Sequence, residues 1–472
     1  MAERSDRGTA APAVRMYEAG GGSGRRTRGA LAGWAVLIAG CFAVGAVLHA
    51  LGVLRIDHLP PLHAHFRVLT VTLLPVVAFA VVAVRKLPGW VRQGGFGRAL
   101  LVAYGCALAW TILLAISADG LAAPFTHREE YLAVLPAVGH DPLGWLAGFT
   151  QRLPEYPTHV RGHPPLPVLV VWALAAVGLG GPLWAAILVI LVGCSAMVAI
   201  GLTVRRLAGE EAARRALPYL ALTPASVWIA TTMDAFFAGA GAWGVALLVL
   251  GRSTAARTWF AGGAGVLLGA LPYLSYGLVP YLVIPLAVAV LVRLPRPAVL
   301  AALAGAAAVT GVFAAAGFSW LAGVAATHAE WAADPGAARP YLYFLVANLA
   351  VLALITGPAT TAGLVHAGHH LTHCPAVTAV GGNPRAHIPM SGIAAAVMNL
   401  ARRHGIAAVV AAALVAVLAL DVSGVTRGEV ERIWVPFAVW IGLSAAYAPG
   451  RRMLAAQVVT GLLLQGLVAS PW

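Results

Sequence analysis

Charge is scarce in this sequence. Only 10% of its 472 residues are charged, whereas 60% are hydrophobic. Soluble domains carry about 25% charged residues, so this scarcity excludes a soluble globular protein. Long apolar runs recur along the chain instead, which is typical of a polytopic, all-α membrane protein.

Lysine is almost absent, and cysteine is rare. Lys86 is the only lysine, while Ala, Gly, Val, Leu and Arg dominate, a bias typical of a GC-rich bacterial genome. The four cysteines are Cys41, Cys106, Cys194 and Cys374, and three of them lie in apolar runs. We therefore expect neither a disulfide nor a CxxC site. The chain also lacks a P-loop and a GxSxG motif, so it shows no sign of an NTPase or a serine hydrolase.

The apolar runs predict about thirteen transmembrane helices of roughly bilayer length. The predicted spans are 30–54, 68–84, 99–117, 182–204, 212–229, 232–251, 258–276, 279–294, 297–320, 341–364, 405–420, 433–448 and 453–470. A shorter run, 164–178, opens with two prolines, and we expect a juxtamembrane helix there. Residues 1–29 are polar and rich in Gly and Arg, which favours a disordered N-terminus.

The basic residues orient this arrangement. They stand in short clusters at the ends of apolar runs, so the net charge of +14 does not indicate nucleic-acid binding. With the N-terminus in the cytoplasm, 23 of the 31 basic residues fall on the inner side and 8 on the outer side. Cytoplasmic loops carry such an excess. We therefore expect a multi-pass protein of the plasma membrane with a cytoplasmic N-terminus.

This orientation predicts one transmembrane domain, residues 30–472, with an outer loop at 118–181 and a cytoplasmic loop at 365–404. Of the 17 acidic residues, 12 fall outside. Acidic residues contribute little to orientation, so the skew indicates an outer face that uses carboxylates in catalysis. The alternative is that outer loops simply lack basic residues.

The outer loop holds the main candidates. Asp119 follows an apolar run by one residue, where a carboxylate at the membrane edge can have its pKa tuned for proton abstraction. Glu129 and Glu130 follow as an acidic pair, and Arg161 and His163 precede Pro164-Pro165. Arginine suits a lipid phosphate because it binds phosphate through two donors. The alternative is that Asp119 caps a helix while the basic side chains extend into lipid headgroups.

Two further acidic positions lie on the predicted outer side. Asp234 falls between two apolar spans, where an ionisable group is a functional candidate by default; the alternative is an N-cap of the next helix. Arg427, Glu429 and Arg432 lie together just before Trp434. If the chain is helical from Glu429, then Glu429 and Arg432 share a face and could hold a phosphate or sugar hydroxyls. The alternative is a solvated loop anchored by Trp434.

A histidine tract at 366–374 has spacings compatible with a metal ion. It matches no standard His/Cys motif and falls on the predicted cytoplasmic side, away from the carboxylates. We therefore predict no metal site and interpret the tract as an insertion with incidental histidines.

The layout of the first half resembles the GT-C glycosyltransferases, in particular the protein-mannosyltransferase-like branch and its actinobacterial members. An acidic residue after an early span, Asp119, is followed by a long outer loop and then by His163-Pro164-Pro165-Leu166 before an apolar run. The segments Val204-Arg205-Arg206-Leu207 and Thr232-Met233-Asp234 are similar to an "ARRL" turn and a "T-x-D" of that branch. The chain departs from the pattern in having two spans before Asp119 and in placing its acidic pair ten residues later.

The resemblance implies an inverting hexosyl- or pentosyltransferase that uses a polyprenyl-phosphate-sugar donor in the bilayer. The acceptor would be a glycan, a lipid or a protein. It implies a carboxylate base, which is Asp119 or one of Glu129 and Glu130, while Arg161, His163 and Arg427 would face the donor phosphate. No cofactor follows from the sequence, although a divalent cation is compatible with the chemistry. A multi-pass transporter or flippase is the alternative, because many helices broken by Pro and Gly are also typical of carriers.

Overall fold

The computed structural model describes residues 21–54, 56, 59–251, 258–372, 404–447 and 450–471. The described chain is helical except for one short antiparallel ladder. In this ladder β1 (His65–Phe66) pairs with β2 (Val468–Ala469), so that His65 faces Ala469. The all-α class predicted from the apolar runs is therefore confirmed for the described residues.

Six described helices are long and apolar enough to cross a membrane. They are α1 (Gly21–Ala50), α2 (Leu74–Trp90, extended by the 3-10 turn η1, Val71–Leu73), α3 (Phe96–Ile116), α8 (Pro182–Ala208), α14 (Arg296–Ala315) and α20 (Gly405–Ser423). A seventh span would be α16 (Tyr341–Thr356) with α17 (Pro358–Thr372), which meet at an angle of 104°. These helices are compatible with a multi-pass membrane protein, whereas the predicted number of thirteen spans is not confirmed.

Several predicted spans are shorter or broken helices. Predicted span 212–229 divides into α9 (Glu210–Ala221) and α10 (Ser226–Ile229), because Pro224 and the residue before it cannot continue a helix. The shorter apolar helices are α7 (Leu166–Ala176), α11 (Asp234–Leu250), α12 (Thr258–Leu274), the unit η6 (Tyr276–Leu278), η7 (Pro280–Leu282) and α13 (Val283–Leu291), and the unit α22 (Val435–Ile441) with η9 (Gly442–Tyr447). Helix α23 (Gly450–Leu467) overlaps the last predicted span, 453–470, but begins and ends three residues earlier.

The N-terminal boundary also differs from the prediction. Helix α1 begins at Gly21, so residues 21–29 are helical rather than disordered, and the residues before them lie outside the described part. Extending a helix that already exists is cheap compared with nucleating one. The loop predicted at 365–404 likewise begins as helix, since α17 continues to Thr372.

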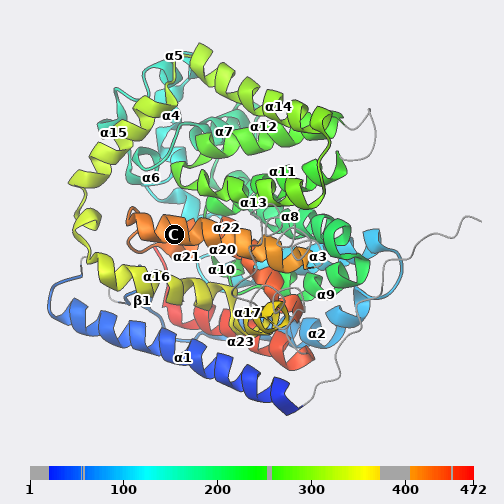
Figure 1. The fold of residues 1–472 in the computed structure, drawn as a ribbon. Helices are drawn as coiled ribbons and strands as arrows, with labels where there is room; N and C mark the ends of the chain where they lie inside the picture. Colours follow the sequence, from blue (N-terminus) through cyan, green and yellow to red (C-terminus); the bar gives the residue numbers. More distant parts are fainter. Residues whose placement is uncertain are drawn as a thin grey trace, which may run out of the picture.

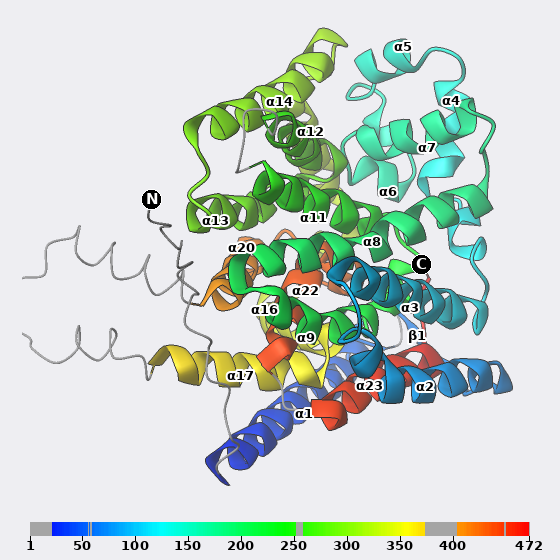
Figure 2. The ribbon, with the colours of Figure 1, turned by 90° about the vertical axis from the view of Figure 1, so that its right-hand side faces the viewer.

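Helices α8, α11, α12 and α14 pack in succession on one side of the molecule (Figure 1). On the opposite side, α1 lies along α16 and α17, and α23 lies between α2 and α17 (Figure 2). Helix α15 (Trp320–Ala333) and the turn η8 (Pro335–Ala338) connect α14 to α16 along one edge of the molecule (Figure 1). Large apolar side chains such as Val36 and Leu303 remain exposed on the outer helices, as expected of helices that face lipid.

The predicted outer loop folds into short helices at the end of the bundle where α3 ends and α8 and α11 begin. They are η2 (Ala123–Thr126), η3 (Tyr131–Val134), α4 (Leu135–Val138), α5 (Pro142–Ala147), η4 (Leu153–Glu155) and α6 (Thr158–Arg161). Phe149 stacks on Tyr156 and meets Phe318, which precedes α15, edge to face. The loop is thus packed against the membrane helices through aromatic side chains and can hold functional groups in fixed positions.

Candidate functional site

A set of ionisable side chains, four of them buried and two half-buried, lies at this loop end of the bundle. Each member comes to the set from one of three distant parts of the chain, and five of the six were named from the sequence. We call this set the polar cluster: Glu130, His159, His163, Asp234, Glu429 and Arg432. Buried charges persist in proteins only when they are paired, coordinated or used.

The acidic pair has two different environments. Glu130 is 4% exposed, and its Oε1 lies 2.9 Å from Nδ1 of His159. Its other oxygen, Oε2, is buried and has no hydrogen-bond partner among the described residues. Glu129 instead accepts the N–H of Thr158 at 2.8 Å, at the start of α6. That backbone hydrogen bond lowers the pKa of Glu129, so Glu129 acts as a cap while Glu130 belongs to the interior.

His163 contributes a neutral ring to the polar cluster. Its Nδ1 lies 2.8 Å from the backbone oxygen of His159, and its ring meets Tyr131 edge to face with centroids 5.8 Å apart. Burial and then the positive charge of Arg432 lower the pKa of His163 to about 3. The ring is therefore uncharged near neutrality, and its affinity for an anion would come from hydrogen bonding.

Arg432 joins the remaining members. Its guanidinium lies 3.5 Å from the carboxylate of Asp234 and 2.9 Å from that of Glu429. Burial alone would raise the pKa of Glu429, but Arg432 and Arg339 outweigh it and hold that pKa at about 2. Asp234 is the first residue of α11, whose N-cap is Met233, so its carboxylate serves the ion pair rather than the cap.

The predicted contact between Glu429 and Arg432 is present, but the chain is not helical from Glu429, as the prediction assumed. Glu429 has a left-handed backbone with φ of 61°, and helix α21 (Val430–Ile433) begins after it. Gly428, with φ of 97°, and Glu429 turn the chain sharply before α21. The contact therefore arises from a turn that precedes a single helical turn.

Three neighbouring residues were not predicted as site residues. His159 and Tyr131 lie close in sequence to residues that were predicted, and both side chains are buried. Glu431 is 1% exposed, accepts the backbone N–H of His63 at 3.4 Å, and has one oxygen without a partner among the described residues. Burial raises the pKa of Glu431 to about 7. The sequence signal for it was the alternation of Glu429 and Glu431 around an apolar residue.

Besides Glu129, three predicted site residues lie outside the polar cluster. The side chain of Asp119 is exposed and takes part in no hydrogen bond or ion pair with any described residue. Arg161 is 35% exposed and pairs with Glu330 of α15 at 3.4 Å. Arg427 donates to the backbone oxygens of Gly424, Ala337 and Arg339, so all of these contacts hold the chain in place rather than leaving the guanidinium open to a ligand.

No group of three or more His, Cys, Asp or Glu side chains in the described segments could hold a metal ion. Within the histidine tract, Nε2 of His366 lies 3.0 Å from the hydroxyl of Thr27 on α1. His373 and Cys374 lie outside the described residues. The described cysteines Cys41, Cys106 and Cys194 are free and buried.

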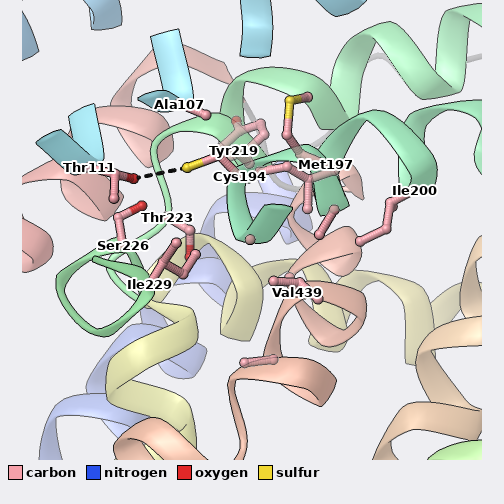
Figure 3. Close-up of a pocket in the computed structure, with 15 residues that line it drawn as sticks. Ala107, Thr111, Cys194, Met197, Ile200, Tyr219, Thr223, Ser226, Ile229 and Val439 are labelled. Atoms are coloured by element: carbon pink, nitrogen blue, oxygen red, sulfur yellow. Dashed lines mark hydrogen bonds between the residues drawn. The ribbon is translucent and has the colours of Figure 1, made fainter. Parts of the chain in front are cut away.

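Two cavities lie among the described helices, and neither is lined by a member of the polar cluster. The smaller, of about 20 Å³, lies among Thr111, Cys194, Tyr219 and Ser226, where the thiol of Cys194 points to the hydroxyl of Thr111 at 3.4 Å (Figure 3). A volume near 15 Å³ is enough for one water, so this cavity is too small for a substrate. The larger is an open groove of about 660 Å³ between α12, α13 and α14, and its lining is overwhelmingly apolar.

Comparisons with protein-family models, with curated proteins and with solved structures found no match for this chain. The function must therefore be argued from the polar cluster and the groove.

Proposed function

We propose that this protein is a membrane glycosyltransferase of the GT-C type, with about thirteen spans in all. It would move a sugar from a polyprenyl-phosphate donor to an acceptor at the outer face of the plasma membrane. The observation that carries the proposal is helix α15, which runs from the apolar groove to the loop that carries part of the polar cluster. A lipid-linked sugar needs both environments side by side, one for its chain and one for its reacting end.

The groove has the properties of a site for a long apolar chain. Its walls include Leu268 and Gly269 of α12, Leu286 of α13 and Leu303 of α14. Leu286 and Leu303 are exposed by 65% and 61%, so the groove is open toward the side that lipid would occupy. Its volume is within the range of ligand sites, about 300–1,000 Å³.

A continuous set of contacts leads from the groove to the loop end. Trp320, which lines the groove, meets the ring of Tyr276 with centroids 5.8 Å apart. Thr327 lies two turns after Trp320 on the same helix, α15. The hydroxyl of Thr327 donates to the backbone oxygen of Arg161 at 3.2 Å. A phosphate at the end of a chain in the groove would therefore lie near Arg161 and its neighbour His163.

The polar cluster supplies the groups that transfer requires. Glu130 would take the proton of the acceptor hydroxyl on Oε2, while His159 holds Oε1. The acceptor oxygen would then bond to the anomeric carbon with inversion, and the bond from that carbon to the phosphate oxygen would break. The departing phosphate takes the electron pair and gains charge, which Arg161 and Arg432 would stabilise. Asp234 and Glu429 would accept hydrogen bonds from sugar hydroxyls.

The contact with His159 favours Glu130 over the exposed Asp119 as the base, because a general base must be held in a fixed orientation toward the proton that it takes. A carrier is less well supported. Carriers commonly place ionisable groups at mid-membrane, whereas Asp234 and Arg432 lie at the ends of their elements.

The test is to block the groove without touching the polar cluster. Ala307 lines the groove, and its neighbour Ala308 does not; both are exposed on α14. We expect Ala307→Phe to weaken the binding of decaprenyl phosphate, measured by native mass spectrometry, and to reduce transfer from decaprenyl-phosphate-[14C]mannose or -[14C]arabinose by at least tenfold. Ala308→Phe should leave both unchanged.

The outcomes separate the two candidate functions. If wild type binds decaprenyl phosphate but transfers neither sugar, while moving the lipid across vesicle bilayers, the flippase alternative gains and the transferase proposal fails. Equal binding by wild type and Ala307→Phe would show that the groove is not the donor site.

A further inference from the structure

Glu429 and Arg432 lie on a short segment, residues 424–432, which we call the arm. Its backbone is left-handed at Gly424, Gly428 and Glu429, with φ of 67°, 97° and 61°. Glycine adopts this conformation freely, but a glutamate does so only when surrounding contacts impose it. The shape of the arm is therefore imposed by the elements around it.

One buried side chain contacts the backbone of the arm at two positions. Asn348, on α16, is 1% exposed. Its amide nitrogen donates to the backbone oxygen of Thr426 and to Oδ1 of Asp421, each at 2.9 Å. Its amide oxygen accepts the N–H of Gly428 at 3.3 Å. Asn348 thus binds the arm on both sides of Arg427 and ties it to the end of α20.

Two arginines attach the other side of the arm to the turn before α16. Arg427 donates to the backbone oxygen of Arg339 at 3.1 Å, and Arg339 donates to the backbone oxygen of Arg427 at 2.8 Å. Arg339 also lies 3.5 Å from Glu429. Because each guanidinium binds the other residue's carbonyl, these contacts fix the arm at its surface, whereas Asn348 fixes it in the interior.

We propose that Asn348 is a positioning residue of the site: it holds the arm so that Arg432 meets Asp234. None of its hydrogen bonds reaches a member of the polar cluster, and its effect passes through the backbone of Gly428 to Glu429 and Arg432. The role in transfer rests on the proposed function, whereas the role in holding the arm does not.

The buried pair of Asn348 and Asp421 allows a sharp design. Asn348→Leu removes all three hydrogen bonds at nearly constant volume. In the exchanged pair, Asn348→Asp with Asp421→Asn, the amide on position 421 can again donate to position 348, and a carboxylate oxygen can accept the N–H of Gly428. The donor to Thr426 is lost and a carboxylate oxygen then faces that carbonyl, so two of the three contacts are restored. Thr356→Val is the matched control, because this buried hydroxyl on the same helix donates only to Leu352 of its own helix.

Hydrogen exchange measured by mass spectrometry reads the arm directly and needs no substrate. We expect Asn348→Leu to speed exchange of the amides of residues 425–433 by at least tenfold, to raise the KM for a decaprenyl-phosphate sugar by about tenfold, and to leave exchange in α8 and α11 unchanged. The exchanged pair should restore most of both effects, and Thr356→Val should show neither.

The possible results distinguish a failure of the inference about Asn348 from a failure of the proposed function. Unchanged exchange of the arm in Asn348→Leu overturns the inference whatever the transfer assay shows. Faster exchange throughout α16 and α20, with no recovery in the exchanged pair, also overturns it, since that pattern is general destabilisation. If wild type transfers sugar and Asn348→Leu loosens the arm without changing KM or kcat, the arm does not serve the site. A wild type inactive with both sugars would count against the proposed function alone.

Discussion

Two polar segments, residues 119–130 and 427–432, contribute to the polar cluster, and in each of them neighbouring residues have different roles. In the first, Asp119 is exposed, Glu129 caps α6 and Glu130 is buried against His159. In the second, Arg427 binds backbone oxygens while Arg432 binds carboxylates. Residue type and spacing do not separate these roles. The partner and the burial of each side chain do.

The largest expected effect concerns the three carboxylates of the first segment. Removing a general base costs about 10²–10⁴-fold in rate. We expect Glu130→Gln to reduce transfer from a decaprenyl-phosphate sugar by at least 100-fold. Glu129→Leu should act through stability, at about 1 kcal/mol for a lost cap, and Asp119→Asn should change the rate by less than about twofold. The measurement is initial transfer rate in protein reconstituted in vesicles.

This ranking has a clear contrary result. If a folded Asp119→Asn protein loses transfer while Glu130→Gln keeps it, the exposed carboxylate is the base and the buried one is structural. The contrast drawn within the first segment would then be reversed.

A smaller effect should separate the two arginines of the second segment. Arg432→Met removes the positive charge that pairs with Asp234 and Glu429. The loss of such a partner typically costs about 3–5 kcal/mol of folding free energy. Arg427→Met loses hydrogen bonds from a charged donor to carbonyls, worth about 1.5–3 kcal/mol each at most, and water can replace part of them at this half-buried position. Thermal unfolding in detergent checks the order. Arg427→Met should keep measurable transfer, and Arg432→Met should not, even below its melting temperature.

The sequence predicted the helical membrane class and much of the polar cluster, because both depend on local composition. Glu130, His163, Asp234, Glu429 and Arg432 were all named from their position between apolar runs. It could not separate Glu130 from Asp119, since burial depends on how the loop packs against distant helices. Helix breaks such as that between α16 and α17 were not predicted, for a related reason. Hydropathy registers an apolar run but not the turn that Gly357, with φ of 84°, allows before Pro358.

The smallest expected effect concerns the pH dependence of stability. It tests whether every charged side chain of the second segment has a partner. Burial raises the pKa of Glu431 from 4.5 to about 7. A carboxyl group whose pKa is higher in the folded protein binds its proton more tightly there. Below pH 4.5 the carboxyl group is protonated in both the folded and the unfolded protein, so it does not oppose folding. As the pH rises from 4.5 through 7, the stability of the folded protein decreases. We expect Glu431→Gln to raise the melting temperature at pH 8 by about 2–4 °C for each 1 kcal/mol gained.

The same variant should have little effect at pH 5, where the wild-type side chain is already protonated in the folded state. Glu429→Gln is the matched comparison, because Arg432 and Arg339 hold the pKa of Glu429 at about 2. That pairing stabilises the protein above pH 4.5 and is lost as the pH falls toward 2, so Glu429→Gln should lower the melting temperature at both pH 5 and pH 8. If Glu431→Gln instead destabilised the protein at pH 8, Glu431 would be a paired carboxylate like Glu429, and the arm would contain no uncompensated charge.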